Sequence, residues 1–316
     1  MKCVILDDYQ QVALSMADWS VLKKQMDVSS ISRHLEGPEL IEAIKDSEIV
    51  IIMRERTPFN AAILEALPNL RLLITSGMRN ASIDLEAAKK QGITVCGTRS
   101  NSEPPTELAW ALILGLARSI PWENKNFREG GPWQKTVGAD LFGKQIGLLG
   151  LGKIGGRMAT IAKAFGMKVV AWSQNLTKEQ AEKNGVELAA SKNELLLTSD
   201  FISIHLVLSD RTRGLIGKEE LQLMKANAYL INTSRAAIVD QEALLCALEN
   251  DWIAGAGIDV FDIEPLPKDH RFRTLPNILA TPHLGYVTEG NYKVYFQEAL
   301  ENIQAFLEGK IIREIR

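Results

Sequence analysis

Three polar residues in the second half of the chain could take part in one reaction, because each follows an apolar, strand-like segment. They are Arg235, Glu264 and His283. Arginine binds carboxylates through its planar pair of donors, histidine donates a proton near neutral pH, and a carboxylate beside it can fix the orientation of the imidazole. This set could bind a 2-keto acid and protonate its carbonyl oxygen. Each residue taken alone is better explained by an ordinary structural role, such as a surface ion pair or a solvated loop acid.

A glycine-rich turn earlier in the chain is a candidate binding site for a dinucleotide. Residues 145–155 read QIGLLGLGKIG, an apolar strand that runs into GxGxxG and then into a helix. Gly150 allows a tight turn, Gly152 lets the backbone approach a pyrophosphate, and Gly155 lets the helix pack close to the strand. Such a turn is weak evidence by itself, but here a second apolar strand at 168–172 completes a βαβ unit. The sequence therefore predicts dinucleotide binding.

The residue expected to meet the adenosine ribose is Ser173, which follows the second strand. An acid at this position would accept hydrogen bonds from the 2′-hydroxyl group and would repel a 2′-phosphate. Ser173 does neither strongly, and the nearest cation along the chain is Lys178. The predicted cofactor is therefore NAD or NADP, with the preference left open.

Apolar runs alternate with helical segments along almost the whole chain, which predicts parallel sheets joined by right-handed crossovers. The runs are rich in Val, Ile and Leu without alternation, as in strands that are covered on both faces. Strands are expected at 3–6, 49–53, 70–75, 93–96, 145–149, 168–172, 201–205, 229–232, 257–260 and 278–280, and helices at 84–91, 106–119, 154–165 and 288–307. The helices 106–119 and 288–307 follow turn-forming clusters, so we expect the chain to leave its first domain at one and to return at the other.

The composition restricts the class of protein. A chain of 316 residues with 46% apolar and 24% charged residues suggests two globular domains. The net charge of -3 lacks the basic excess that nucleic-acid binding requires, and no apolar run approaches the roughly 18 residues of a membrane span. The three scattered cysteines, Cys3, Cys96 and Cys246, predict buried thiols in a reducing compartment. We therefore expect a cytoplasmic protein with no nucleic-acid partner, no membrane contact and no metal site.

Taken in order, these motifs resemble the D-isomer-specific 2-hydroxyacid dehydrogenases over nearly the whole chain. The resemblance is carried by residues 150–155, 205–208 with 212–216, 232–235, 259–265 and 281–285. It implies an α/β fold of two doubly wound parallel-sheet domains. A Rossmann dinucleotide-binding domain at 103–285 would be inserted into a discontinuous, flavodoxin-like substrate domain at 1–102 and 286–316. It also implies a homodimer, with the apolar Leu108–Leu116 face of the first crossing helix in the interface.

The resemblance also implies a reaction and a role for each site residue. The reaction is hydride transfer between a nicotinamide cofactor and C2 of a small D-2-hydroxy acid or 2-keto acid, such as glyoxylate or hydroxypyruvate. Arg235 would bind the substrate, His283 would be the acid/base, and Glu264 its partner. The residues implied at the cofactor are Gly150, Gly152, Lys153, Ile154, Gly155, Ser173, His205, Thr233 and Asp259, with Lys153 and Ile154 donating backbone N–H groups to the pyrophosphate and Asp259 meeting the nicotinamide carboxamide. Ala236, Val207 and Ser173 depart from the usual family residues, and only Ser173 bears on the cofactor.

The resemblance further implies that a loop in the first domain binds the substrate carboxylate through backbone N–H groups at Met78 and Arg79. Arg54 and Arg56 follow an earlier strand. They could form local ion pairs with Glu55, or Arg54, together with Arg79, could meet a second anionic group on the substrate.

The sequence leaves the role of Trp133 open, since this residue could belong to a lid or to the core. Two rival functions also fit the same motifs. One is a dinucleotide-sensing protein without catalysis, like the corepressors of this family, and the second is a short form of phosphoglycerate dehydrogenase.

Overall fold

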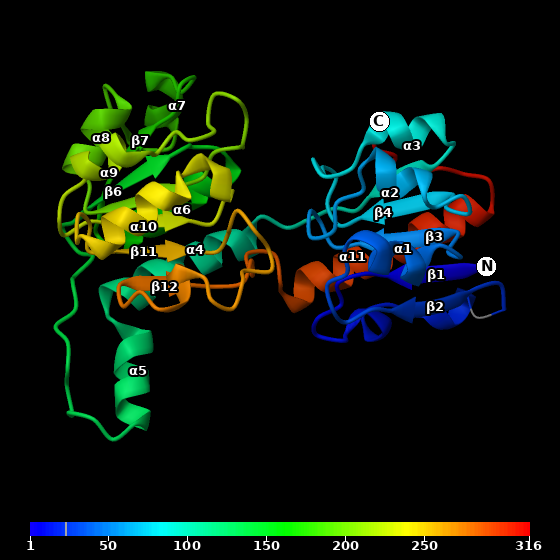
Figure 1. Ribbon diagram of the computed structural model, residues 1–316. Helices are drawn as coiled ribbons and strands as arrows, with labels where there is room; N and C mark the ends of the chain where they lie inside the picture. The colour runs from blue at the N-terminus through cyan, green and yellow to red at the C-terminus, as the bar shows by residue number, and fades with distance from the viewer. Residues whose placement is uncertain (23) are drawn as a thin grey trace. The chain divides into compact units, whose positions relative to one another are not determined.

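The structure is a computed structural model that describes residues 1–22 and 24–316. The chain forms two compact units, of which unit 1 comprises residues 1–101 and 287–316 and unit 2 comprises residues 102–286. Unit 2 is thus an insertion in the sequence of unit 1. Each unit is built on a parallel sheet of its own (Figure 1).

The sheet of unit 1 has five strands in the order β2-β1-β3-β4-β5, all paired in parallel. The strands are β1 (Lys2–Ile5), β2 (Asp27–Ser30), β3 (Ile49–Ile52), β4 (Leu72–Thr75) and β5 (Thr94–Gly97). Strands β3 and β4 read IVII and LLIT and are buried throughout, as expected for strands that are covered on both faces. This strand order is that of the flavodoxin-like doubly wound sheet, and it confirms the fold predicted for this domain.

The helices of unit 1 come from both ends of the chain. They are α1 (Gly37–Ile44), α2 (Ala61–Glu65), α3 (Leu85–Lys90) and the long α11 (Glu289–Leu307). Helix α11 packs against β4, and the backbone N–H of Ile315 donates to the carbonyl of Val95 at 2.9 Å. The segment that follows unit 2 in the sequence therefore completes the core of unit 1.

The sheet of unit 2 has seven parallel strands in the order β12-β11-β10-β9-β6-β7-β8. The strands are β6 (Gln145–Leu149), β7 (Lys168–Trp172), β8 (Glu187–Leu188), β9 (Phe201–Ile204), β10 (Tyr229–Asn232), β11 (Gly255–Ile258) and β12 (Ile278–Ala280). The helices are α4 (Glu103–Ala117), α5 (Ile120–Arg128), α6 (Lys153–Ala164), α7 (Lys178–Lys183), α8 (Lys192–Thr198), α9 (Lys218–Leu223) and α10 (Gln241–Glu249). The strand order reverses between β6 and β9, and open α/β sheets bind their ligands at such a reversal.

Helix α4 begins at Glu103, earlier than predicted, with Pro104 and Pro105 in its first turn. Proline fits there because the first N–H groups of a helix have no acceptor within it. The apolar face of α4 was expected in a dimer interface, and this expectation was wrong. Leu112 and Leu116 are buried within unit 2, where α4 packs against β10, β11 and α6.

Helix α5 was not predicted, because a proline at position 121 is typical of a helix end. In the structure Pro121 lies in the first turn of α5. Helix α5 and the loop that follows it project from the rest of unit 2 (Figure 1). Trp133 in this loop is 83% exposed and meets Phe127 edge-on, with the ring centroids 6.3 Å apart. This exposure excludes a core role for Trp133.

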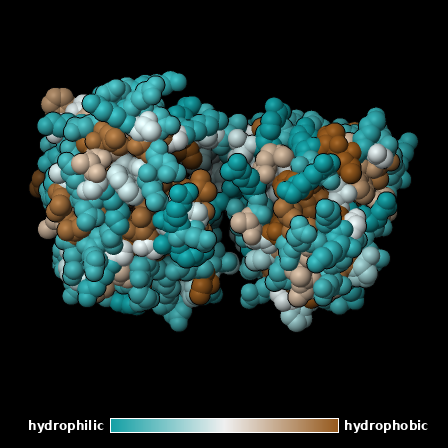
Figure 2. All heavy atoms as spheres, turned by 90° about the horizontal axis from the view of Figure 1, so that it is seen from above, coloured by the Kyte–Doolittle hydropathy of each residue, from teal (hydrophilic) through white to brown (hydrophobic). Residues whose placement is uncertain are grey.

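The surface of the molecule is mostly hydrophilic in the view of Figure 2, with apolar residues scattered over both units. Among the described residues, no helix combines the length and the apolar character needed to cross a membrane. Cys3 and Cys96 are buried free thiols, whereas the free thiol Cys246 is partly exposed, contrary to the prediction that all three are buried.

Candidate active site

His283 and Glu264, predicted to act as a pair, are in direct contact within unit 2. The Nδ1 atom of His283 lies 2.7 Å from Oε2 of Glu264, and both side chains are about a quarter exposed or less. The other carboxylate oxygen, Oε1, accepts from the backbone N–H of Phe261 at 2.9 Å. Because a carboxylate accepts, Nδ1 of His283 carries the proton in this pair. The opposite nitrogen, Nε2, is thereby left to exchange a proton with a ligand.

The loop that carries His283 is held by Asp259, which follows β11 and is fully buried. Its Oδ1 atom accepts from the hydroxyl of Thr281 at 2.6 Å and from the N–H of Leu284 at 2.7 Å, and Oδ2 accepts from the N–H of Gly285 at 2.8 Å. Burial raises the pKa of the Asp259 carboxyl, although these hydrogen bonds act in the opposite direction. His283 has a left-handed backbone with φ of 53°, a conformation that persists only where the surroundings enforce it.

Arg235 is presented by the loop directly after β10. The buried side chain of Asn232 fixes this loop, because its Nδ2 donates to the carbonyl of Arg235 at 3.0 Å and its Oδ1 accepts from the N–H of Ser234 at 3.0 Å. The N–H of Asp259 donates to the carbonyl of Asn232. Strands β10, β11 and β12 are neighbours, so Arg235, Glu264 and His283 are all delivered at the carboxyl edge of the same sheet.

The glycine-rich turn has the geometry that a pyrophosphate requires. Gly150 has φ of 101°, and a Cβ on Gly155 would lie 2.2 Å from the carbonyl oxygen of Gly150, so neither position accepts a side chain without strain. A Cβ on Gly152 would meet nothing within 4 Å, so the space above it is open. Helix α6 begins at Lys153 without a side-chain cap. The N–H groups of its first turn, including those of Lys153 and Ile154, therefore suit a bound anion.

A pocket of about 300 Å³ joins this turn to the end of β7. It is lined by Leu151, Gly152, Ser173, Asn175, Leu176, Gln180, Lys183 and Asn184. Ser173 follows β7 directly, as predicted, and this pocket is where the ribose of a dinucleotide on the glycine turn would lie. The glycine turn and this pocket therefore fit the pyrophosphate and the adenosine ribose of a dinucleotide.

His205 and Thr233 follow β9 and β10, two neighbouring strands on the same side of the site where the strand order reverses. The backbone carbonyl of His205 lies so close to Gly150 that a Cβ there would approach it to 2.6 Å. The Nε2 atom of His205 lies 2.9 Å from the hydroxyl of Ser203, and burial lowers its pKa to about 4. His205 is therefore a neutral imidazole at physiological pH, beside the phosphate-binding turn.

In unit 1, a cavity of about 600 Å³ brings together Arg54, Met78 and Arg79 from the predicted substrate end, and with them Arg99. Arg56 is not part of this cavity. Its guanidinium donates to the carbonyl of Asp7 at 2.9 Å and lies over the ring of Tyr9, 4.6 Å from the centroid. Arg56 thus has a local structural role.

Several residues that shape these sites were not predicted. Asn232 and Asn80 fix loops by hydrogen bonds from buried amide groups, and Arg99 lines the cavity of unit 1. Asn232 lies within one of the motifs that carry the family resemblance, but neither asparagine has a sequence signal that marks it as a loop clamp. Among the described residues, no group of three or more His, Cys, Asp or Glu side chains could hold a metal ion.

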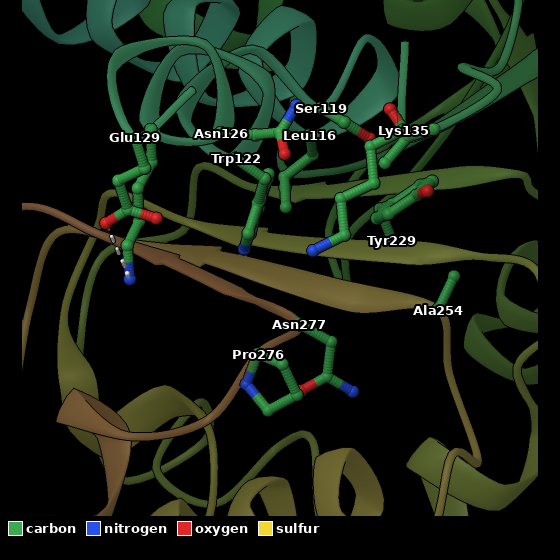
Figure 3. Close-up of a pocket in the computed structure, with 12 residues that line it drawn as sticks. Leu116, Ser119, Trp122, Asn126, Glu129, Lys135, Tyr229, Ala254, Pro276 and Asn277 are labelled. Atoms are coloured by element: carbon green, nitrogen blue, oxygen red, sulfur yellow. Dashed lines mark ion pairs between the residues drawn. The ribbon is translucent and has the colours of Figure 1, made fainter. Parts of the chain in front are cut away.

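A second pocket of unit 2, of about 410 Å³, lies under helix α5 (Figure 3). Trp122, Asn126 and Glu129 lie on one side of it, and Tyr229, Pro276 and Asn277 line it from the sheet and its loops. It contains none of the predicted catalytic residues. This pocket therefore belongs to the projecting arm rather than to the active site.

Comparison with known proteins places this geometry in a family. Residues 110–285 match the family described as "D-isomer specific 2-hydroxyacid dehydrogenase, NAD binding domain". The chain is 36% identical over 304 residues to a glyoxylate reductase of Aeropyrum pernix, covering 92% of this chain and 90% of that protein. It is also 36% identical over 288 residues to a D-3-phosphoglycerate dehydrogenase of Methanocaldococcus jannaschii, covering 90% of this chain but only 54% of that protein.

Solved structures agree with this result. A phosphoglycerate oxidoreductase of Vibrio cholerae superimposes with a TM-score of 0.93 at 36% sequence identity, over 98% of this chain and 99% of that one. A glycine turn at the strand reversal, a histidine–glutamate pair at the sheet edge and similarity over nearly the full length all lead to one conclusion. The chain belongs to the D-isomer specific 2-hydroxyacid dehydrogenase family of nicotinamide-dependent oxidoreductases.

Proposed function

We propose that the chain reduces the carbonyl group of a small 2-keto acid, of the glyoxylate and hydroxypyruvate class, to the D-2-hydroxy acid, and also catalyses the reverse reaction. The observation that carries this proposal is the 2.7 Å contact between His283 and Glu264. A histidine that is held by a carboxylate through Nδ1 is poised to exchange a proton through Nε2.

The roles of the residues follow from the chemistry of the carbonyl. A bound reduced nicotinamide supplies the hydride for C2. His283 donates the proton that the carbonyl oxygen needs, so that C2 gains a hydride, the oxygen gains a proton and a secondary alcohol results. Glu264 stabilises the protonated imidazole before the transfer and keeps its ring oriented. In the reverse direction His283 takes the hydroxyl proton back.

Arg235 would bind the substrate carboxylate and polarise the carbonyl group, because its planar donor fork matches a carboxylate. The family pattern adds the backbone N–H groups of Met78 and Arg79 to the same carboxylate. We assign Asp259 a positioning role, since both of its oxygens hold the loop of His283. Residues 102–286 would form the dinucleotide-binding domain, and the remainder of the chain the substrate domain.

The cofactor pocket supports the use of both NADH and NADPH. None of the residues that line the pocket beside Ser173 is acidic, and Lys183 is among them. Nothing in this lining would repel a 2′-phosphate, whereas an aspartate in place of Ser173 would. We expect kcat/KM values for the two cofactors within about tenfold of each other. Ser173→Asp should shift the ratio toward NADH by about tenfold or more.

The reaction can be tested by following nicotinamide absorbance with glyoxylate, hydroxypyruvate and pyruvate. Reduction of at least one of these acids, and a loss of about 100-fold or more in kcat in the His283→Ala variant, would support the proposal. If no acid is reduced while the dinucleotide still binds, the chain acts as a dinucleotide sensor instead.

We further propose a homodimer formed through helix α5 and the loop after it. This segment projects from unit 2 (Figure 1), and it exposes Ile120, Phe127, Trp133 and Val137. Such a cluster of apolar side chains is typical of a protein interface. Sedimentation should give a dimer for the native chain and a monomer for the Phe127→Glu, Trp133→Glu double variant. Leu14→Glu, at an exposed apolar residue of unit 1, is the matched control.

A cytoplasmic location is supported by the cysteines. Cys3 and Cys96 are free and buried, and burial raises the pKa of Cys3 to about 12 and that of Cys96 to about 11. Thiols of this kind suit a reducing compartment. Fractionation of the native cell, with the chain detected by antibody, would test the location.

A further inference from the structure

A buried aromatic ring lies against the imidazole of His283 in unit 2. The ring of Tyr286 meets it edge-on, with the ring centroids 5.4 Å apart and the planes inclined by 70°. Aromatic rings prefer such a T-shaped arrangement to a face-to-face one. Only 5% of Tyr286 is exposed, so its ring is enclosed by the protein. The imidazole of His283 therefore has a second contact besides its hydrogen bond to Glu264.

The hydrogen bond to Glu264 does not by itself fix the direction of the imidazole. It holds a single ring atom of His283, Nδ1, and a hydrogen bond tolerates a bend of about 30° before it weakens. The torsion angle that turns a histidine ring has broad minima, so the ring can swing within that range. Such a swing displaces Nε2, the atom that would transfer the proton. Fixing Nε2 therefore requires a contact from a second direction.

The backbone conformation of His283 brings the two rings together. Side chains three residues apart in an extended strand lie about 10 Å from each other, because the rise is about 3.3 Å per residue. His283 instead has a left-handed backbone, with φ of 53°, and its ring contacts that of Tyr286. A left-handed backbone is costly for a residue other than glycine and is concentrated at functional sites. Here it allows a contact that an extended chain could not make.

Asp259 fixes the two residues that lie between the rings. Its carboxylate accepts from the N–H of Leu284 at 2.7 Å and from the N–H of Gly285 at 2.8 Å. Because Asp259 is fully buried, these hydrogen bonds are protected from water. The segment from His283 to Tyr286 is therefore ordered before any ligand binds, and so is the contact between the two rings.

A buried tyrosine could also serve packing alone, and the two roles make different demands on the side chain. A core position accepts an apolar side chain of similar volume at little cost. A contact that limits the rotation of an imidazole needs a flat, rigid surface beside that ring. The roles therefore predict different results when the ring of Tyr286 is replaced by an aliphatic side chain.

We propose that Tyr286 is a positioning residue that limits the rotation of the His283 imidazole, so that Glu264 and Tyr286 together fix the direction of Nε2. The proposal rests on the proposed function, because that function gives Nε2 a proton to transfer. The ring of Tyr286 makes the contact, so a phenylalanine should replace it and a leucine should not.

Steady-state kinetics with the best of the 2-keto acids tests the effect on the reaction. Tyr286→Leu should lower kcat by about tenfold or more, because a displacement of about 1 Å at a reacting atom can cost about 100-fold. Its KM values should stay within about twofold of the native ones, since substrate and cofactor are bound by other residues. Tyr286→Phe keeps the ring and should restore kcat to within about twofold of the native value.

Tyr229→Leu is the matched control. It makes the same substitution in the same unit, at a ring that stacks on Phe201 with the centroids also 5.4 Å apart. Tyr229 begins β10, so it lies at the amino edge of the sheet, opposite the edge that carries His283. This variant should keep native kcat, although it too loses an aromatic pair. Equal losses of kcat in the two leucine variants would indicate a general effect on packing and would overturn the proposal.

An NMR measurement without substrate separates this proposal from the proposed function. The ¹⁵N shifts of the imidazole show which nitrogen carries the proton, and His283→Ala identifies the signals of His283 among those of the four histidines. In the native chain and in Tyr286→Phe, the neutral ring should carry its proton on Nδ1, facing Glu264. In Tyr286→Leu, an Nε2–H fraction of about 10% or more should appear, because the freed ring can turn away from Glu264.

If no 2-keto acid is reduced, the proposed function fails, and the NMR measurement then decides the role of Tyr286. The same tautomer fractions in Tyr286→Leu and in the native chain would refute that role, as would native kcat in this variant. Tyr286→Met, which fills the space with a flexible side chain, replaces Tyr286→Leu in both measurements if the leucine variant does not fold.

Discussion

Glu264 contacts His283 through one carboxylate oxygen and is held by the backbone of Phe261 through the other. Its charge therefore faces the imidazole in a fixed direction. We expect Glu264→Gln to lower kcat by at least about tenfold, because the amide cannot stabilise a protonated imidazole as a carboxylate does. Steady-state kinetics at saturating cofactor would measure this.

Asp262→Asn, in the same loop, is the matched control for this change and should keep kcat near the native value. Its backbone N–H donates to the side chain of Gln241, and the hydrogen bonds that hold His283 and Glu264 together do not involve its carboxylate. If Glu264→Gln retained native kcat, the assignment of His283 and Glu264 as a working pair would be wrong.

Asp259 offers a test of how the histidine loop is held. In Asp259→Asn one of the two oxygens becomes an NH₂ group, which faces N–H donors that it cannot pair with. A buried, unpaired polar group costs about 1–3 kcal/mol. We expect the free energy of unfolding of unit 2 to fall by that amount, together with kcat. If the free energy of unfolding and kcat of this variant both equalled those of the native chain, the loop would keep its conformation without the carboxylate.

Two glycines of the turn allow protein stability and cofactor binding to be tested separately. Gly155→Ala places a Cβ 2.2 Å from the carbonyl oxygen of Gly150, so it should destabilise unit 2 by about 1–3 kcal/mol. The Cβ added in Gly152→Ala would meet no protein atom within 4 Å, so the melting temperature of this variant should equal that of the native chain. The added methyl group should nevertheless weaken cofactor binding by about tenfold or more, measured by fluorescence titration. Native affinity in Gly152→Ala would place the pyrophosphate elsewhere.

His205 should make the stability of the protein depend on pH. Burial lowers its pKa from 6.5 to about 4. Between these values the unfolded chain binds a proton that the folded chain does not, so stability rises with pH. The contribution is complete above about pH 6.5 and is lost toward pH 4, at about 1.4 kcal/mol per pH unit. The free energy of unfolding, measured by urea denaturation at several pH values, should depend less steeply on pH in His205→Asn than in the native chain. An unchanged pH dependence would show that His205 is not its cause.

Much of the fold could be predicted because parallel strands that are covered on both faces read as short apolar runs. Strands such as β3 and β6 were found in this way. Strands β2 and β8 were missed, since β2 reads DVSS at the edge of its sheet and β8 has only two residues. Strand β11 begins at Gly255, earlier than predicted, because Gly255 and Gly257 weaken the apolar signal.

The residues of the candidate site that could be predicted are those whose side-chain type is required by the reaction itself. His283 and Glu264 could be named because acid/base chemistry requires those side chains. Arg99 could not, because its place depends on β5 lying beside β4 and on Glu298, which lies almost two hundred positions later in the chain. Contacts over that separation leave no local pattern.

The insertion of unit 2 within unit 1 sets an order for events at the ribosome. All of residues 102–286 emerge before helix α11 does. Unit 2 can therefore collapse as a continuous chain, whereas the first sheet must wait for α11 to cover β4. Glu298 arrives with that helix, so Arg99, which follows β5, acquires its carboxylate partner only after all of unit 2 has been synthesised. The sheet of unit 1 is therefore begun before unit 2 and completed after it.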